Sequence, residues 1–301
     1  MSYKYTVNNQ FLTKEQRDFY EKNGFLVIRK LIPQNELDRY HKRFVDICHK
    51  RVDDTGAMTI MKDVALKNRQ DVDPERVINK IQDYQADPEL SSYFRLPQIL
   101  KYVECFTGRD CSAVHTMLIN KPPDPGTKSS RHPLHQDLYY FPFRPTDRIV
   151  CSWTAMQKVH RNNGCLVVLP GTHTGELLRH GYPEWSGGVN KMYHGILDYK
   201  VDDKKLVYLE MEPGDTVFFH PILIHGSGTN RTNGFRKAIS CHYSTSHSHY
   251  IDVKGTIQED LAKEVVNVAE KKFPSGEWDI QKIWTAKRVV LQGRDTNHSA
   301  L

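Results

Sequence analysis

A histidine and an aspartate two residues apart, His135 and Asp137, form the one His-x-Asp tripeptide of the chain. On a strand, residues i and i+2 point to the same side, so this imidazole and this carboxylate could bind one metal ion. Two histidines and one carboxylate leave three metal positions open, which suits non-haem iron(II) that takes a bidentate co-substrate and oxygen together. Alone the tripeptide is weak evidence for a metal site, because a His/Asp pair on the surface or in the core is the commoner arrangement.

The second histidine has five candidates downstream, which are His220, His225, His242, His247 and His249. His225 is favoured because it follows the aromatic end of a predicted strand and has two glycines within the next three residues. Glycines let the backbone approach a ligand closely. We therefore expect His135, Asp137 and His225 to hold the metal, with the other four histidines as alternatives.

Arg236 follows His225 by eleven residues, and the polar stretch between them, residues 229–234, is typical of a hairpin loop. Such a loop would return Arg236 to the side of His225. A guanidinium makes the planar, two-pronged contact that the far carboxylate of a dicarboxylate requires. His220 has the same spacing to Arg231, but Arg231 lies at the loop tip, so we favour His225 with Arg236. An ordinary exposed cation is the alternative for Arg236.

Helices are expected in the first 110 residues. A capping box at Thr13 predicts a helix that ends at Gly24, and a short strand follows at Phe25–Arg29. Two more helices are expected, one from Pro33 and one over Pro97–Phe106.

From Ser112 onward the pattern changes to short β-rich runs separated by Gly/Pro turns. The expected strands are Ala113–Ile119, Ile149–Ala155, Cys165–Leu169, Val207–Met211, Thr216–Phe219 and Phe235–His242. Many short strands without helices between them predict a sandwich or jelly roll. Residues 174–203 form a long insertion of the kind that serves as a lid or binding loop. A last helix is expected at 258–272, and the polar residues 53–87 receive no assignment.

Bulk properties indicate an ordinary globular protein of 301 residues, with 39% hydrophobic residues, 26% charged residues and a net charge of +6. No apolar run approaches the roughly 20 residues that span a bilayer, and the first residues predict no secretory signal. The basic residues are dispersed, so no nucleic-acid partner is expected. Six cysteines without a Cys-x-x-Cys pair predict free, buried thiols in a reducing compartment.

Four longer motifs together carry a resemblance to a known family. They are Arg131–Leu138, Asn162–His173, Gly214–Pro221 and Tyr102–Gly108. With these motifs the chain resembles, over nearly its whole length, the phytanoyl-CoA dioxygenase family of iron(II)- and 2-oxoglutarate-dependent oxygenases. The resemblance implies a mainly β fold with flanking α-helices, a double-stranded β-helix or jelly roll. We expect a single domain, residues 1–301, with a helical region to about 110, a core of about 111–245 and a tail of 246–301.

The resemblance also implies the activity. It is the 2-hydroxylation of a 3-methyl-branched fatty acyl-CoA in fatty acid α-oxidation, with iron(II), 2-oxoglutarate and O2, and with ascorbate as reductant. His135, Asp137 and His225 match the family's iron ligands. The positions that match its 2-oxoglutarate contacts are Lys80, Met117, Trp153, Ser227 and Arg236. From the residues alone, Lys80 reads as a solvated lysine, Met117 and Trp153 as core residues, and Ser227 as a turn residue.

The resemblance and the C-terminus together suggest a cellular location. The chain ends in Ser299, Ala300 and Leu301, which is similar to the Ser-Lys-Leu peroxisomal tag but lacks its basic middle residue. A peroxisomal enzyme that meets an import receptor is expected, with the cytoplasm as the alternative.

Two other functions compete with hydroxylation. A related halogenase would need a vacant iron position for halide, and Asp137 argues against one. A non-catalytic jelly-roll binding protein, or the same oxygenase chemistry on another small molecule, are the remaining alternatives.

Overall fold

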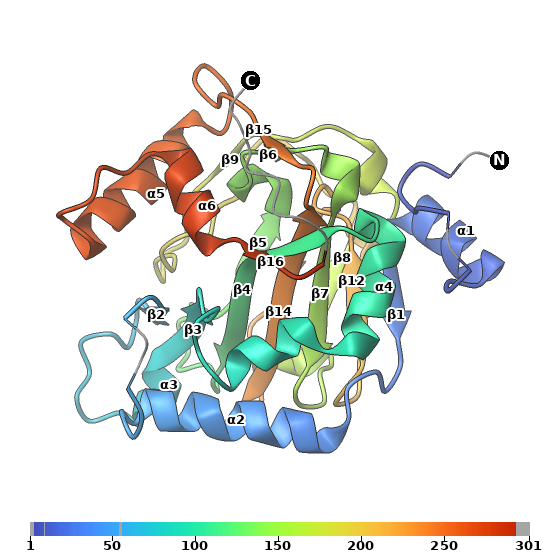
Figure 1. Ribbon diagram of the computed structural model, residues 1–301. Coiled ribbons are helices and arrows are strands. Elements are labelled where there is room, and N and C mark those ends of the chain that lie inside the picture. Colours follow the sequence, from blue (N-terminus) through green and yellow to red (C-terminus); the bar gives the residue numbers. More distant parts are fainter. Residues whose placement is uncertain (1–2, 9, 54–55, 293–301) are drawn as a thin grey trace.

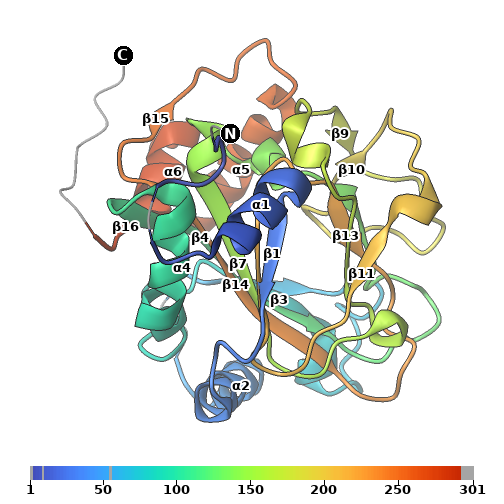
Figure 2. The ribbon, with the colours of Figure 1, turned by 90° about the vertical axis from the view of Figure 1, so that its right-hand side faces the viewer.

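The computed structural model describes residues 3–8, 10–53 and 56–292. Two antiparallel sheets face each other, and helices cover the outer side of the larger one (Figures 1 and 2). The larger sheet has the order β1 (Phe25–Ile28), β12 (Thr216–Phe219), β7 (Ile149–Ala155), β14 (Arg236–Thr245), β4 (Cys111–Lys121), β3 (Ile78–Gln82) and β2 (Thr59–Lys62), and β16 (Val289–Val290) also pairs with β4. The smaller sheet has the order β11 (Val207–Leu209), β8 (Leu166–Val168), β13 (His225–Ser227) and β5 (His132–His135).

The central strands of the larger sheet are buried on both faces. Phe218 of β12 and Ile239 of β14 pack into the core formed with the helices. Their neighbours Phe219 and Ala238 point the other way, into the core between the two sheets, because side chains alternate along a strand. Two facing antiparallel sheets with this alternation are the arrangement of a jelly roll. The predicted fold, mainly β with flanking helices, is therefore confirmed.

The helices are α1 (Lys14–Asn23), α2 (Gln34–Cys48), α3 (Pro74–Val77), α4 (Pro97–Thr107), α5 (Glu259–Lys272) and α6 (Ile280–Lys287). α1 begins with the predicted capping box, in which the Gln16 backbone N–H donates to Thr13 Oγ1 at 3.2 Å, and it ends at Gly24 in the left-handed conformation. α2 and α4 lie across the larger sheet in Figure 1. The N-terminal helices and α5 are thus confirmed, whereas α6 was not expected.

Two segments contain more structure than the sequence indicated. Residues 53–87, which received no assignment, supply β2, α3 and β3 at one edge of the larger sheet. The insertion at 174–203 holds the small hairpin of β9 (His180–Gly181) and β10 (Gly195–Ile196). A further short pair joins β15 (His249–Tyr250) to β6 (Phe143–Arg144). The division of the chain near residues 110 and 245 stays a prediction.

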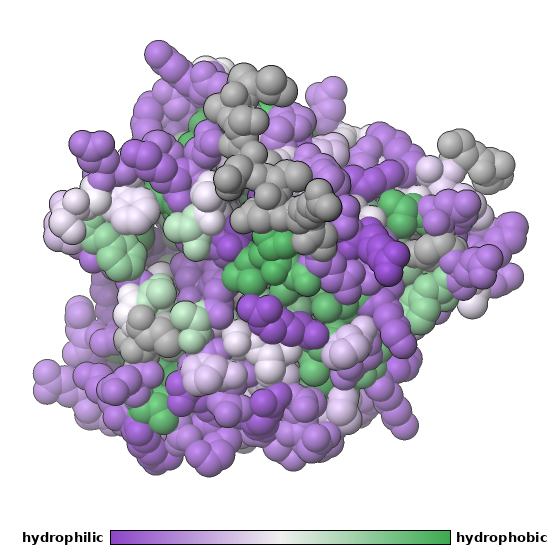
Figure 3. Space-filling model, in the orientation of Figure 1, coloured by the Kyte–Doolittle hydropathy of each residue, from purple (hydrophilic) through white to green (hydrophobic). Residues whose placement is uncertain are grey.

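The C-terminal helices are joined to the core by Gln258, the residue before α5. Its side-chain amide nitrogen lies 3.0 Å from the carbonyl oxygens of Leu138, Tyr139 and Phe141. The α5–α6 pair projects beside β2 and β3, and the surface is hollowed between them, while the rest of this face is mostly hydrophilic (Figure 3).

All six cysteines are buried thiols outside any disulfide, as predicted. Among the described residues there is no helix with the length and apolar character needed to cross a membrane.

Candidate metal and co-substrate site

The two favoured histidines lie opposite each other on neighbouring strands of the smaller sheet. His135 ends β5 and His225 begins β13, and the two residues are direct partners in the antiparallel register. Their rings are 4.2 Å apart between centroids. Asp137 follows at the first position of a 3₁₀ turn, Asp137–Tyr140, and its carboxylate reaches both rings. The Nε2 atoms of His135 and His225 lie 3.3 and 3.7 Å from the Asp137 oxygens.

The hydrogen bonds of the two imidazoles fix which nitrogen faces the carboxylate. Nδ1 of His135 lies 2.9 Å from the carbonyl oxygen of Pro133, and Nδ1 of His225 lies 2.9 Å from that of Leu223. A carbonyl can only accept, so each Nδ1 carries the proton and each Nε2 keeps a free lone pair. One ligand atom from each of His135, Asp137 and His225 lies within 4.8 Å of the others. This donor set fits a divalent iron ion with open coordination positions.

Asp137 is held as an ionised carboxylate. Its Oδ2 atom also lies 2.7 Å from Nε2 of His242 on β14. Burial raises the pKa of Asp137, but the neighbouring His225 and His242 rings outweigh burial and hold that pKa well below its usual value. His242, one of the five candidates, therefore supports the carboxylate from the larger sheet.

The residue between the two proposed ligands anchors the turn. The Gln136 amide nitrogen donates to the carbonyl oxygens of Glu176 and Ile222, both at 3.0 Å. Its side-chain oxygen accepts the backbone N–H of Leu178 at 2.8 Å. These three bonds tie the segment that carries His135 and Asp137 to the insertion and to the segment that precedes His225. This role could not be predicted from the sequence, because a glutamine between two proposed ligands has no distinctive spacing.

A second part of the pocket is cationic. Arg236, the first residue of β14, is only 1% exposed, and burial lowers its pKa to about 10. Its Nε and Nη1 atoms have no hydrogen-bond partner within the part of the chain that the structure describes, and its guanidinium carbon lies 5.5 Å from the centre of the Trp153 ring. A buried guanidinium with two free donors fits the far carboxylate of 2-oxoglutarate. An exposed cation, the alternative for Arg236, is wrong.

A second cation, Lys121 of β4, is 3% exposed and lies beside Arg236. Its Nζ atom donates to Ser227 Oγ and to the carbonyl oxygen of Gly228, both at 2.7 Å. Since that Oγ already accepts from Lys121, the Ser227 hydroxyl proton remains to be donated elsewhere. Arg236 and Lys121 are register partners on β14 and β4.

Lys80, Met117 and Trp153 line the same pocket from three strands of the larger sheet. Lys80 of β3 is 4% exposed, and its ammonium group lies 4.7 Å from the centre of the Tyr193 ring. Burial lowers the pKa of Lys80 to about 8, and Asp137 and Asp83 oppose that shift. The reading of Lys80 as a solvated lysine is therefore wrong, and Tyr193 places part of the insertion against the pocket.

The other histidine candidates lie elsewhere. His220 is buried beside Tyr5 and lies 3.6 Å from Asp147. His247 is exposed and lies 3.2 Å from Asp110, and His249 belongs to β15. The alternative anchor Arg231 is exposed on its loop.

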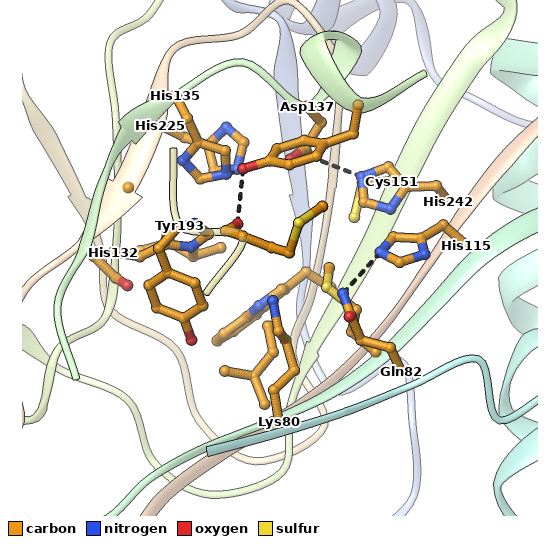
Figure 4. A pocket seen from close by; sticks show the side chains of 18 of the residues that line it. Lys80, Gln82, His115, His132, His135, Asp137, Cys151, Tyr193, His225 and His242 are labelled. Carbon is orange, nitrogen blue, oxygen red and sulfur yellow. Dashed lines mark hydrogen bonds and ion pairs between the residues drawn. The ribbon is translucent and has the colours of Figure 1, made fainter. Parts of the chain in front are cut away.

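The pocket that these residues line encloses about 1030 Å³ of empty space, including the open solvent at its mouth. Figure 4 shows His135, His225 and Asp137 together at one side, with His242 approaching Asp137, and Lys80 pointing up from the opposite strand. His132 and Tyr193 stack against each other beside His135, with 4.2 Å between the His132 and Tyr193 centroids. The arrangement can hold a metal ion, a dicarboxylate and a further molecule in one cavity.

Comparison of the sequence with known proteins gives a consistent result. The sequence model of one family, described as "Phytanoyl-CoA dioxygenase (PhyH)", matches residues 20–238. "Phytanoyl-CoA dioxygenase, peroxisomal" of Homo sapiens is 57% identical over 296 residues, which cover 98% of this chain and 87% of that protein. "Probable phytanoyl-CoA dioxygenase" of Caenorhabditis elegans is 52% identical and covers 97% of both chains.

Solved structures show the same fold at low identity. The epimerase SnoN, in complex with Fe3+, alpha ketoglutarate and nogalamycin RO, matches with a TM-score of 0.60 at 17% identity, over 80% of this chain and 86% of that one. EctD from S. alaskensis, with 2-oxoglutarate and 5-hydroxyectoine, matches with a TM-score of 0.59 at 15% identity, over 81% and 80% of the two chains.

Proposed function

Because the chain belongs to the phytanoyl-CoA dioxygenase family, we propose that it hydroxylates C2 of a 3-methyl-branched fatty acyl-CoA, an α-oxidation step. The enzyme class is that of the family, a 2-oxoglutarate-dependent dioxygenase. The substrate is the proposal, and it is supported by relatives that share more than half of their residues with this chain over nearly its full length.

The proposed iron ligands are His135, Asp137 and His225. The observation that carries this assignment is the cross-strand pair of histidines, whose free Nε2 atoms lie within 3.7 Å of one ionised carboxylate. The proposed 2-oxoglutarate contacts are Lys80, Met117, Trp153, Ser227 and Arg236. They are supported by their common place in the pocket and by the two donors of Arg236 that have no partner in the described part of the chain.

Iron(II) with 2-oxoglutarate and O2 supplies the oxidation of a C–H bond, for which no protein side chain is suited. The protein side chains would bind and orient the metal ion and 2-oxoglutarate. Arg236 would bind the far carboxylate, and Ser227, whose oxygen is occupied by Lys121, would donate its proton to the same group. Apolar and aromatic walls from Met117 and Trp153 exclude water from the co-substrate. A group for acid–base catalysis is not required.

Hydroxylation is preferred to halogenation because the Asp137 carboxylate is present and reaches both histidines. The three-ligand cluster and Arg236, whose Nε and Nη1 have no partner among the described residues, line one pocket, which favours an enzyme over a non-catalytic binding protein. The binding protein remains an outcome of the experiment below.

The proposed location is the peroxisome, reached through an import receptor. The support is that curated relatives are named peroxisomal. The tripeptide Ser299–Leu301 lies outside the described residues.

The test is decarboxylation of labelled 2-oxoglutarate by the full chain with iron(II) and ascorbate, over a panel of branched acyl-CoAs, free acids and small polar metabolites. We expect succinate release in step with one oxygen added at C2 of the branched acyl-CoA, detected by mass spectrometry. Succinate release coupled only to another metabolite would refute the substrate. An acyl-CoA that binds without any 2-oxoglutarate consumption would favour a binding protein.

A further inference from the structure

Strand β4 runs along the length of the pocket. Every second residue of β4 from His115 to Lys121 lines the cavity, so these two residues lie roughly 20 Å apart along the strand. Arg236 is the register partner of Lys121, and His242 is that of His115. Since His242 binds Asp137, the metal site lies toward the His115 end, and the cationic co-substrate end lies at the other.

The wall at the His115 end comes from the C-terminal helices. Val265 of α5 and Trp284 and Lys287 of α6 line the pocket. These residues lie beyond the segment 20–238 that the family model matches. The wall therefore belongs to the pocket but contains none of the proposed iron ligands or 2-oxoglutarate contacts.

Several contacts hold this wall in place. Lys287 Nζ lies 3.1 Å from Asp83 Oδ1 at the end of β3. Lys287 also accepts, at its backbone oxygen, the Gln85 amide at 2.7 Å. On the other side, Glu264 of α5 accepts from Tyr182 at 2.7 Å and pairs with His194 at 3.1 Å, both from the insertion. The α5–α6 pair is thus positioned by both rims of the pocket mouth.

Trp284 carries an unused donor at this wall. It is 4% exposed and packs edge-on against Phe141, Phe143 and His115, with centroid distances of 5.3, 5.7 and 5.8 Å. Its Nε1 atom has no hydrogen-bond partner among residues 3–8, 10–53 and 56–292. A buried indole N–H normally has an acceptor, and leaving one without is costly. Because Trp284 lines the pocket, a bound molecule can provide that acceptor.

The surroundings indicate a neutral acceptor with an apolar attachment. Lys287 is neutralised by Asp83, whereas Arg236 and Lys121 at the far end have no carboxylate within ion-pair distance among the described residues. A dicarboxylate would therefore bind at the far end. A neutral N–H in an aromatic wall suits a carbonyl oxygen next to an alkyl chain.

We propose that Trp284 Nε1 donates a hydrogen bond to the thioester carbonyl oxygen of the acyl substrate. The carbonyl carbon is bonded to C2, so the bond holds C2 on the metal side of the pocket. Trp284 is a specificity-determining residue for acyl thioesters, and the inference rests on the proposed function.

The test is Trp284→Phe, which keeps an aromatic ring but removes the N–H. Loss of one neutral hydrogen bond predicts a KM for the acyl-CoA raised roughly 2- to 12-fold. The fraction of 2-oxoglutarate turnover coupled to C2 hydroxylation should fall, while the Kd for 2-oxoglutarate stays unchanged. The matched control is Trp278→Phe between the same two helices, because Trp278 is half-buried outside the pocket lining and its Nε1 donates to the Phe273 carbonyl at 2.9 Å.

An unchanged KM and coupling in Trp284→Phe, or an equal change in Trp278→Phe, would overturn the assignment. A second measurement needs no variant. The wild-type chain should bind an acyl-CoA thioester more tightly than the thioether that lacks the carbonyl, and equal affinities would overturn it as well. If the wild-type chain hydroxylates acyl-CoA while these tests fail, only the inference falls. If it hydroxylates no acyl-CoA, the proposed function falls with it.

Discussion

Arg236→Lys keeps a positive charge in the co-substrate pocket but removes the planar fork. The wild-type guanidinium is 1% exposed, and its Nε and Nη1 atoms have no hydrogen-bond partner among the described residues, so Nη2 and one of these atoms can bind a carboxylate through two parallel bonds. A lysine can replace at most one of these bonds from a single point. Loss of one charge-assisted bond costs about 1.5–3 kcal/mol, which corresponds to about 10- to 150-fold weaker binding of 2-oxoglutarate.

The assay is calorimetric titration of the iron(II)-loaded protein with 2-oxoglutarate under anaerobic conditions. Arg231→Lys is the matched control, because Arg231 lies exposed on the preceding loop and should leave the Kd unchanged. Iron affinity should be the same in both variants, since neither residue contacts the ligand cluster. A Kd within twofold of wild type in Arg236→Lys, or an equal loss in Arg231→Lys, would refute the two-bond reasoning.

Three further predictions concern the same pocket. Alanine at His135, Asp137 or His225 should each abolish coupled hydroxylation in a protein that circular dichroism shows to be folded, and near-wild-type product from any one variant would remove that residue from the iron site. Lys80, whose pKa burial lowers to about 8, should lose its charge between about pH 7 and pH 9, so the affinity for 2-oxoglutarate should fall over that range. Lys80→Met should bind weakly with a flat pH profile, and a profile as steep as wild type would assign the titration elsewhere. Lys121→Met, which frees the Ser227 hydroxyl, should weaken 2-oxoglutarate roughly 2- to 12-fold but leave 2-oxopentanoate, which lacks the far carboxylate, unaffected. Equal losses for both compounds would mean that Lys121 does not act through the far carboxylate.

The spacing of His135 and Asp137 predicted convergent side chains, and the structure shows both why this worked and where it was wrong. The expected strand stops at His135, and Asp137 already belongs to a 3₁₀ turn. The two side chains still converge because Gln136 between them is extended, with φ −122° and ψ 124°. The prediction that the two side chains converge was therefore right, although the strand that it assumed ends at His135, before Asp137.

Lys80 could not be found from pattern, for a physical reason. β3 reads Ile78-Asn79-Lys80-Ile81-Gln82, and Lys80 and Gln82 face the pocket where an ordinary strand would place apolar residues. The polar residues that suit the strand for binding also remove its hydrophobic signature. The strand therefore stayed unassigned.

Trp284 lay beyond prediction because its role depends on tertiary packing. Periodicity can predict a helix near residues 258–272, but not that the helix after it returns to cover the mouth of a pocket built from residues between 80 and 242. The contacts of Glu264 with the insertion and of Lys287 with Asp83 decide that placement. None of these pairs has a spacing that sequence alone could detect.

Gln258 makes the metal site and the C-terminal helices thermodynamically coupled. Its amide nitrogen contacts the carbonyl oxygens of Leu138, Tyr139 and Phe141, the residues that directly follow Asp137. A change that orders this turn also favours docking of the helices, and docking favours the ordered turn by the same free energy, because such coupling is reciprocal. If iron binding orders this turn, it would favour docking of the C-terminal helices by the same amount. Substitutions far along the chain, in helices that touch no metal ligand, can shift metal affinity through this single side chain.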